Sequence, residues 1–135
     1  MKFTITGKIR GKQRPRVTRS HTYTPKQTIE YEKLVRYSLT CTDDVVKFDD
    51  DAVLQANIKA YFKVPKSYTK KKIAKIEARS WYQTNKPDGD NIIKIILDAL
   101  NGAAYKDDTQ VAIIQIEKVY TFEEEHIDVE IHSVN

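Results

Sequence analysis

The sequence predicts a small domain of the α/β (α+β) class, in which helices pack on a mixed β-sheet of about four strands. Apolar and polar residues alternate, as in strands, near both ends of the chain and in its middle. The segments between these predicted strands include stretches with helical periodicity, which is clearest in residues 90–100. The chain of 135 residues is long enough for one hydrophobic core and too short for two, so residues 1–135 are expected to form a single domain.

The first third of the chain is expected to form a strand, a loop and a helix. Residues 2–9 alternate and predict the strand, whereas residues 11–23 combine Gly and Pro with polar side chains and predict the loop. Thr24 and Pro25 are typical of a helix start, with Thr24 as N-cap and Pro25 as the first helical residue. This helix should run to about Leu39. Its buried residues are expected to include Ile29, Leu34 and Tyr37.

The remaining elements follow in order. An acidic connection over residues 42–51 leads to a strand over residues 52–64, and a short basic helix is expected over residues 70–80. Residues 111–122 and 126–134 both alternate and are joined by three glutamates. Because successive strands with a short polar connection commonly pair, these two are expected to form a β-hairpin.

The helix within KPDGDNIIKIILDALN, residues 86–101, is the most informative element. On a helical wheel its apolar residues fill an arc of roughly 200°, wider than the stripe that a surface helix usually buries. The helix is therefore expected to be deeply buried and to end at Gly102, with a narrow polar face that carries Asp90, Lys94 and Asp98. The wide arc has two explanations: a sandwich between the sheet and the short basic helix, or contact with a partner chain.

Two aspartates flank Gly89 at the start of this helix. One of them would cap the helix and interact favourably with its dipole, but this structural explanation accounts for only one carboxylate. Neighbouring carboxylates repel each other, and a cation between them relieves the repulsion. If the chain returns to the helix start, Asp88, Asp90 and one of Asp107 or Asp108 would form an all-oxygen site suited to Mg²⁺ or Mn²⁺. The residue types alone leave both explanations open.

Other kinds of site fit the sequence poorly. An EF-hand is excluded because Ile92 and Ile93 follow DGDN and no glutamate closes a loop. The histidines and Cys41 lack zinc-ligand spacing, and there is no phosphate-binding glycine loop or nucleophile elbow. The single cysteine, the absence of a signal-peptide pattern and the lack of a long apolar run predict a cytoplasmic protein without a membrane segment.

The net charge of +4 is unevenly distributed along the chain. Residues 1–36 carry ten Lys or Arg against two Glu, and residues 59–79 carry eight against one Glu. Acidic residues gather elsewhere, around the helix of residues 86–101 and near the C-terminus. Two basic segments beside a separate acidic cluster predict a surface that binds a polyanion, and a solvated surface without a partner is the alternative.

The segment KPDGDNIIKIILDALNGAAYKDDTQV, residues 86–111, resembles the signature of the RusA family of Holliday junction resolvases. The shared features are Asp-x-Asp-Asn, a Lys four residues after the second Asp, Asp-Ala-Leu, and an aromatic residue followed by Asp-Asp-x-Gln. The segment GKQRPRVTRSHTYTP, residues 11–25, also resembles the basic N-terminal region of phage-type members. The two segments together cover about a third of the chain.

The resemblance implies a homodimeric, Mg²⁺-dependent endonuclease, with Mn²⁺ able to substitute, that cuts four-way DNA junctions symmetrically during recombination and repair. The metal-binding carboxylates carried over are Asp88, Asp90 and Asp108, and Lys94 matches a catalytic lysine. Asp98 and Asn91 match signature positions interpreted as structural, and Asp107 is the acid next to Asp108. Gly89 departs from the family pattern, because many members have a bulkier residue there.

The basic segments would then bind the phosphates of branched DNA. The residues expected to do so are Lys12, Arg14, Arg16, Arg19, Lys70, Lys71 and Lys72. Unpaired bases would stack on one or more of Tyr23, Tyr68, Trp81 and Tyr82, although core packing is an alternative role for each. Two other functions remain open: a less selective branched-DNA or flap nuclease, and a non-catalytic nucleic-acid-binding module.

Overall fold

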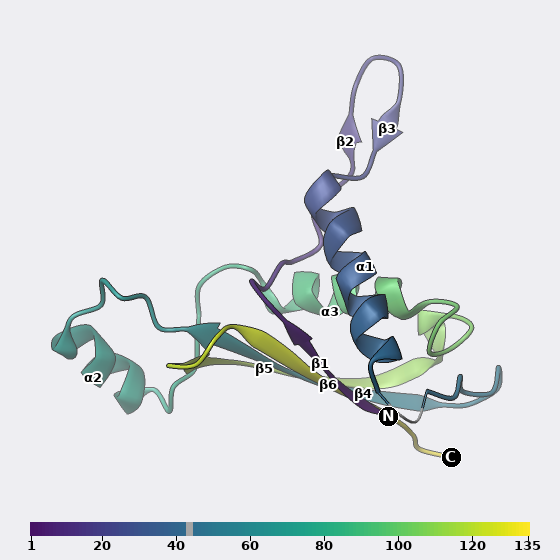
Figure 1. Cartoon of the computed structure of the whole chain (residues 1–135). Helices are drawn as coiled ribbons and strands as arrows, with labels where there is room; N and C mark the ends of the chain where they lie inside the picture. Colours follow the sequence, from purple (N-terminus) through teal and green to yellow (C-terminus); the bar gives the residue numbers. More distant parts are fainter. Residues whose placement is uncertain (43–44) are drawn as a thin grey trace.

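The centre of the structure is a mixed sheet with the strand order β1-β6-β4-β5 (Figure 1). Its strands are β1 (Lys2–Thr6), β6 (His126–Ser133), β4 (Leu54–Lys63) and β5 (Val111–Thr121). β4 pairs parallel with β5 and antiparallel with β6, which in turn pairs antiparallel with β1. This computed structural model describes residues 1–42 and 45–135, so Asp43 and Asp44 of the predicted acidic connection lie outside the described residues.

Two helices cover one face of the sheet, and a third lies beyond its end (Figure 1). The covering helices are α1 (Lys26–Thr40) and α3 (Gly89–Leu100), while α2 (Lys70–Ala78) is the predicted basic helix. The α+β class and the mixed four-stranded sheet are therefore confirmed. No helix in the described part of the chain is both long and apolar enough to cross a membrane.

Helix α3 is buried as its wide apolar arc predicted. Ile92, Ile95, Ile96 and Leu100 are fully buried in the core between the sheet and the neighbouring helix. That neighbour is α1, and not the basic helix α2, which was one of the two explanations of the wide arc. After the last turn the chain reverses at Gly102, whose φ of +79° lies in the left-handed region where glycine is favoured.

The buried face of α1 differs from the predicted one. Ile29 is 42% exposed and Tyr37 is 66% exposed, so the expectation that they are buried was wrong. The residues buried instead are Thr28, Tyr31, Val35, Ser38 and Leu39, and Leu34 is half-buried. Since α1 carries apolar residues on more than one face, contacts with β1 and α3 decide which face turns inward. The helix also begins one residue later than predicted, because Pro25 is its N-cap.

The predicted hairpin between the last two strands is also wrong, because β4 lies between β5 and β6. Alternation specifies which side of a strand is buried but not which strand lies next to it. The connection between β5 and β6 passes the end of β4 and is fastened by Glu125. Its carboxylate accepts hydrogen bonds from the backbone amides of Ile9 (3.0 Å) and Lys63 (3.3 Å).

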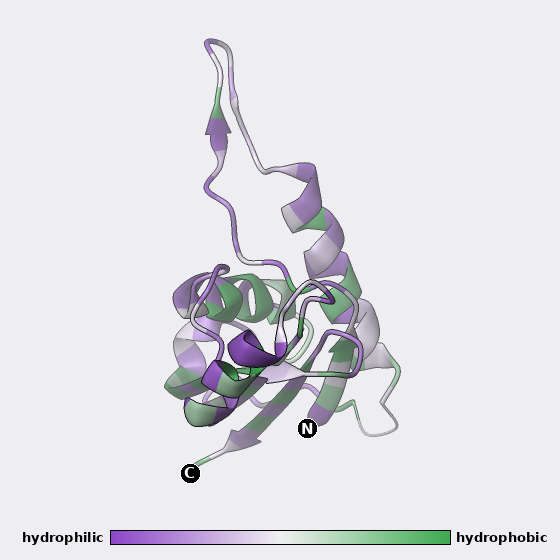
Figure 2. Cartoon of the chain, turned by 90° about the vertical axis from the view of Figure 1, so that its left-hand side faces the viewer, coloured by the Kyte–Doolittle hydropathy of each residue, from purple (hydrophilic) through white to green (hydrophobic). Residues whose placement is uncertain are grey.

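The predicted N-terminal loop contains a small hairpin that projects from the body. Strands β2 (Arg16–Val17) and β3 (Thr22–Tyr23) pair antiparallel, and the Thr18 amide donates to the His21 carbonyl across the turn at 2.8 Å. We call residues 14–24 the arm. It extends beyond the start of α1, away from the sheet, and is largely hydrophilic (Figure 1 and Figure 2).

Candidate active site

The carboxylate of Asp88 does not cap α3, although Asp88 occupies the N-cap position. Its backbone is extended, its carbonyl accepts the amides of Asn91 and Ile92 at 3.1 Å, and its side chain makes no capping hydrogen bond. Asp90 lies in the first turn, and both side chains are exposed. We call Asp88 and Asp90 the N-terminal pair. The helix therefore leaves two neighbouring carboxylates available to a cation.

Lys94 lies one turn beyond Asp90 on the narrow polar face of α3 and is exposed. Lysine and aspartate side chains one turn apart on a helix often form an ion pair, but Lys94 forms none with Asp90 or Asp98 among the described residues. Asp98 is paired instead with the ammonium group of Lys12, at 3.2 Å. The Lys94 side chain is thus exposed and not held by the aspartates one turn away.

A second lysine, which sequence reasoning missed, approaches the N-terminal pair from β5. The ammonium group of Lys118 donates to the Asn85 carbonyl at 2.6 Å, in the segment that leads into α3. Burial lowers the pKa of Lys118, and the nearby Asp88 carboxylate opposes that shift. The alternation of β5 marked this residue as polar but carried no information about its proximity to Asp88.

Three further carboxylates gather at the other end of α3, and we call Asp98, Asp107 and Asp108 the C-terminal group. Burial raises the pKa of Asp108, and contacts with Asp107 and Asp98 raise it further. The Asp107 carboxylate accepts the Thr109 amide at 3.1 Å in a capping box, and this hydrogen bond lowers its pKa. Asp107 thus has a structural role, while Asp98 and Asp108 form a close pair of like charges.

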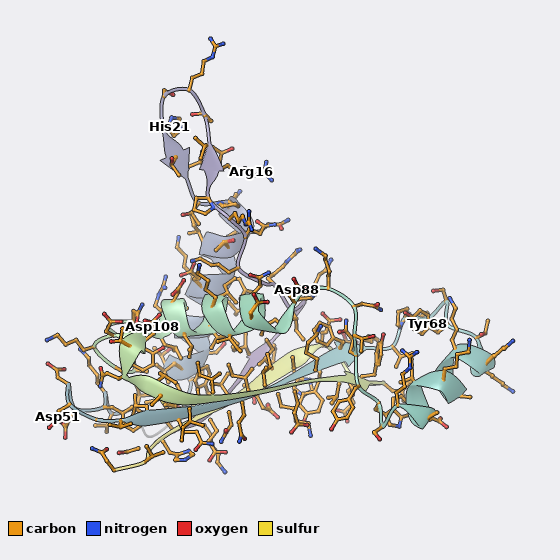
Figure 3. All side chains as sticks on the ribbon, turned by 180° about the vertical axis from the view of Figure 1, so that it is seen from behind. Arg16, His21, Asp51, Tyr68, Asp88 and Asp108 are labelled. Atoms are coloured by element: carbon orange, nitrogen blue, oxygen red, sulfur yellow. The ribbon has the colours of Figure 1, made fainter. Side chains whose placement is uncertain are left out.

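The two groups of carboxylates do not meet within one chain. Figure 3 shows Asp88 and Asp108 at opposite ends of α3, and the eight residues from Asp90 to Asp98 span about 12 Å of helix. Oxygen ligands of one Mg²⁺ ion lie about 2 Å from it, which is too short a reach to join the two groups. In the described residues, no cluster of three or more Asp, Glu, His or Cys side chains could hold a metal.

The tight turn after α3 is the reason for this separation. The chain reverses at Gly102, whose amide donates to the Tyr105 carbonyl at 2.8 Å, and the Asp108 amide donates to the Asn101 side chain at 2.8 Å. Asp108 is therefore held at the helix end and does not return to the helix start. The N-terminal pair alone still suits Mg²⁺, which proteins often hold through one or two carboxylates together with substrate phosphates and water.

The basic residues of the N-terminal region have two different environments. Lys12 is 19% exposed and donates to Glu32 at 2.7 Å as well as to Asp98. Burial alone would lower the pKa of Lys12, but its hydrogen bonds to the two carboxylates raise it overall. Lys12 therefore joins the base of the arm to α1 and α3. In contrast, Arg14, Arg16 and Arg19 are exposed on the arm.

The basic residues of α2 form a separate surface beyond the end of the sheet (Figure 3). Lys70, Lys71 and Lys72 are exposed in its first turn, where the Thr69 hydroxyl caps the helix. The Lys72 ammonium group lies 5.0 Å from the centre of the Tyr68 ring, a cation–π contact. The arm and α2 thus present cations on two sides of α3.

The aromatic candidates for base stacking differ in exposure. Tyr23, on the arm, is 42% exposed and lies 5.7 Å from the His21 ring, while Tyr82 is 51% exposed. Trp81 packs edge-on against Phe122, with 5.4 Å between ring centres. Tyr23 and Tyr82 are therefore more available to an unpaired base than Trp81.

The similarity to known proteins extends over nearly the whole chain. A family model described as Endodeoxyribonuclease RusA matches residues 6–132. The protein named "Uncharacterized protein YqaN" of Bacillus subtilis (strain 168) is 32% identical over 141 aligned residues, which cover 100% of this chain and 97% of that protein. The family match runs from the end of β1 into β6, so it includes α3 and both groups of carboxylates.

Proposed function

The chain belongs to the RusA family of endodeoxyribonucleases, and from this premise we propose that it resolves Holliday junctions by paired, symmetric, Mg²⁺-dependent cuts. The observation that carries the proposal is the N-terminal pair, two adjacent exposed carboxylates that α3 does not use as caps. Exposed cations of the arm and of α2 lie on either side, where they would attract the DNA backbone.

Each side chain of the site would have a separate role in phosphodiester cleavage. Asp88 and Asp90 would hold the Mg²⁺, with Mn²⁺ able to substitute, and the bound cation would polarise a phosphoryl oxygen and lower the pKa of a water molecule. The Lys94 ammonium group would stabilise the negative charge that develops on the phosphate. Arg14, Arg16 and Arg19 would bind phosphates farther along the strand and fix its position.

A homodimer would give Asp108 a part in this reaction. The C-terminal group lies too far from the N-terminal pair of its own chain, as described above. If two copies pair about a two-fold axis with their α3 helices antiparallel, the C-terminal group of one copy lies beside the N-terminal pair of the other. Such a dimer also supplies the two equivalent sites that symmetric cleavage of a four-way junction requires.

The proposal is tested by incubating the purified protein with a synthetic four-way junction, with and without Mg²⁺. The expected result is a pair of symmetric nicks that depends on Mg²⁺ and is absent with Asp88→Asn. Equal cleavage of a flap substrate would favour the less selective nuclease. Tight binding of the junction without cleavage in either Mg²⁺ or Mn²⁺ would contradict both nuclease functions and support the non-catalytic binding module.

A further inference from the structure

A cleft of about 410 Å³ opens directly beside Asp88. One wall is the chain of residues 8–13, the second is the first turn of α1, and the third is the segment of residues 86–91 that begins α3. Ligand sites in proteins commonly have volumes of about 300–1,000 Å³, so this cleft has room for more than a phosphate group alone.

Close backbone contacts hold the first and third walls together. The Lys12 amide donates to the Asn91 carbonyl at 2.8 Å. A Cβ atom on Gly11 would lie 2.9 Å from the Pro87 Cβ and 3.1 Å from the Asn91 Cβ, so only glycine permits this approach without a shift. The cleft is therefore built into the same piece of structure that positions Asp88.

The α1 wall of the cleft contains a buried hydroxyl group that has no partner in the described part of the chain. Thr28 is only 1% exposed, and its Oγ1 atom has no hydrogen-bond partner among the described residues. Buried polar atoms in folded proteins are nearly always hydrogen-bonded, so an exception in the lining of a cleft is a candidate contact for a bound ligand. The amide side chains of Gln13, Gln27 and Asn91 also line the cleft, and each offers both donors and an acceptor.

Cations complete the cleft. Lys8, Arg10 and Lys86 line it together with Asp88, and none of them belongs to the ion-paired set of Lys12, Glu32 and Asp98. Basic side chains bind phosphates, whereas amide and hydroxyl groups recognise the edges of bases. The combination matches one nucleotide, with its phosphates on the cations and its base among the amides.

We infer that this cleft binds a single unstacked nucleotide of the DNA strand, adjacent to the phosphate that is cut. The inference rests on the proposed function, because that function places the reacting phosphate at Asp88. A base inside a duplex is stacked and paired and cannot enter the cleft without the cost of extrusion. At a branch point that cost is reduced, so the cleft would couple cleavage to branched structure.

The test uses four-way junctions that carry 2-aminopurine at successive positions around the branch point, bound in EDTA so that no cleavage occurs. Because unstacking increases 2-aminopurine fluorescence, wild-type protein should raise it severalfold at one position of the junction and at none of a matched duplex. Thr28→Val and Gln27→Ala should each weaken this response by about 3- to 10-fold. Thr28→Val removes an unsatisfied hydroxyl at nearly constant shape, so its melting temperature should not fall.

Gln115→Ala is the matched control, because Gln115 is exposed and lines a different groove, with Lys2 and Lys59. Its response should equal that of wild type. No fluorescence increase at any position, or an increase that both cleft variants retain, would overturn the inference. Cleavage of junctions without a fluorescence increase would contradict the nucleotide site and still support the proposed nuclease function. If the fluorescence increases with wild-type protein and is lost in the two cleft variants, but Mg²⁺ produces no cleavage, the nucleotide site is supported and the proposed nuclease function is contradicted.

Discussion

The arrangement of charge at the start of α3 depends on individual residues. Asp88 has the backbone conformation of an N-cap, but its carboxylate makes no capping hydrogen bond. Asp90 adds a second carboxylate in the first turn, where the helix dipole favours negative charge. The positive end of the helix dipole thus offsets part of the repulsion between the two aspartates.

Replacing either member of the N-terminal pair should separate cleavage from binding. Asp88→Asn and Asp90→Asn should each lower the rate of junction cleavage by at least about 100-fold, because one ligand of the cation is lost. Junction affinity should stay equal or increase, since a negative charge near phosphate is removed. Single-turnover cleavage and gel-shift titrations measure the two effects. Asp51→Asn, on an exposed loop, is the control, and parallel loss of binding would indicate a folding role instead.

Lys12 and Arg16 should behave as opposites, although the sequence predicted both as phosphate ligands. Lys12→Met leaves the carboxylates of Glu32 and Asp98 without their shared cation, so the free energy of unfolding should fall by about 1–3 kcal/mol. Arg16→Ala, on the exposed arm, should leave the free energy of unfolding unchanged. It should reduce the slope of log affinity against log salt concentration by about one, because one phosphate contact is lost. Urea titrations and salt-dependent binding measure these quantities. If Lys12→Met instead reduces the salt slope and leaves stability unchanged, Lys12 is a phosphate ligand, as the sequence predicted.

Among the elements, those with a strong local pattern were predictable, and those that depend on distant partners were not. Helix α3 was predicted because its apolar residues leave only one narrow polar face, and a short basic helix was predicted where α2 lies. The neighbour of β5 and the inward face of α1 were not predictable, because long-range packing selects among faces and strands of similar polarity. The arm was predicted to be a loop, because strands of only two residues each are too short to produce an alternating pattern.

The inward face of α1 can be checked by two truncations. Leu39 is 1% exposed in the core, so Leu39→Ala should lower the free energy of unfolding by about 2–5 kcal/mol. Ile29 is 42% exposed, so Ile29→Ala should cost less than about 1 kcal/mol. Chemical denaturation of the two variants measures both values. The reverse order would mean that α1 is rotated toward the face that the sequence predicted.

For the whole molecule, the residue types of the candidate site were predictable and their grouping was not. The doubled aspartates and Lys94 follow from the sequence pattern of a single helix. The distance from Asp90 to Asp108 depends on the turn at Gly102, which directs the chain along the end of α3 instead of back to its start. One chain therefore presents two separate groups of carboxylates, and the proposed dimer would bring the N-terminal pair of one copy beside the C-terminal group of the other.

Mixed dimers distinguish a shared site from a site within one chain. Asp88→Asn and Asp108→Asn homodimers should both be inactive. If each site joins the N-terminal pair of one copy to the C-terminal group of the other, a dimer of one Asp88→Asn chain and one Asp108→Asn chain has one site with both substitutions and one intact site. It should therefore nick one strand of the junction without resolving it. If each site lies within one chain, every site in the mixed dimer carries a substitution and no nick appears.

Light scattering establishes that dimers form, and differently tagged chains confirm their exchange. A strict monomer on junction DNA, or exchanged dimers that never nick, would contradict the shared site.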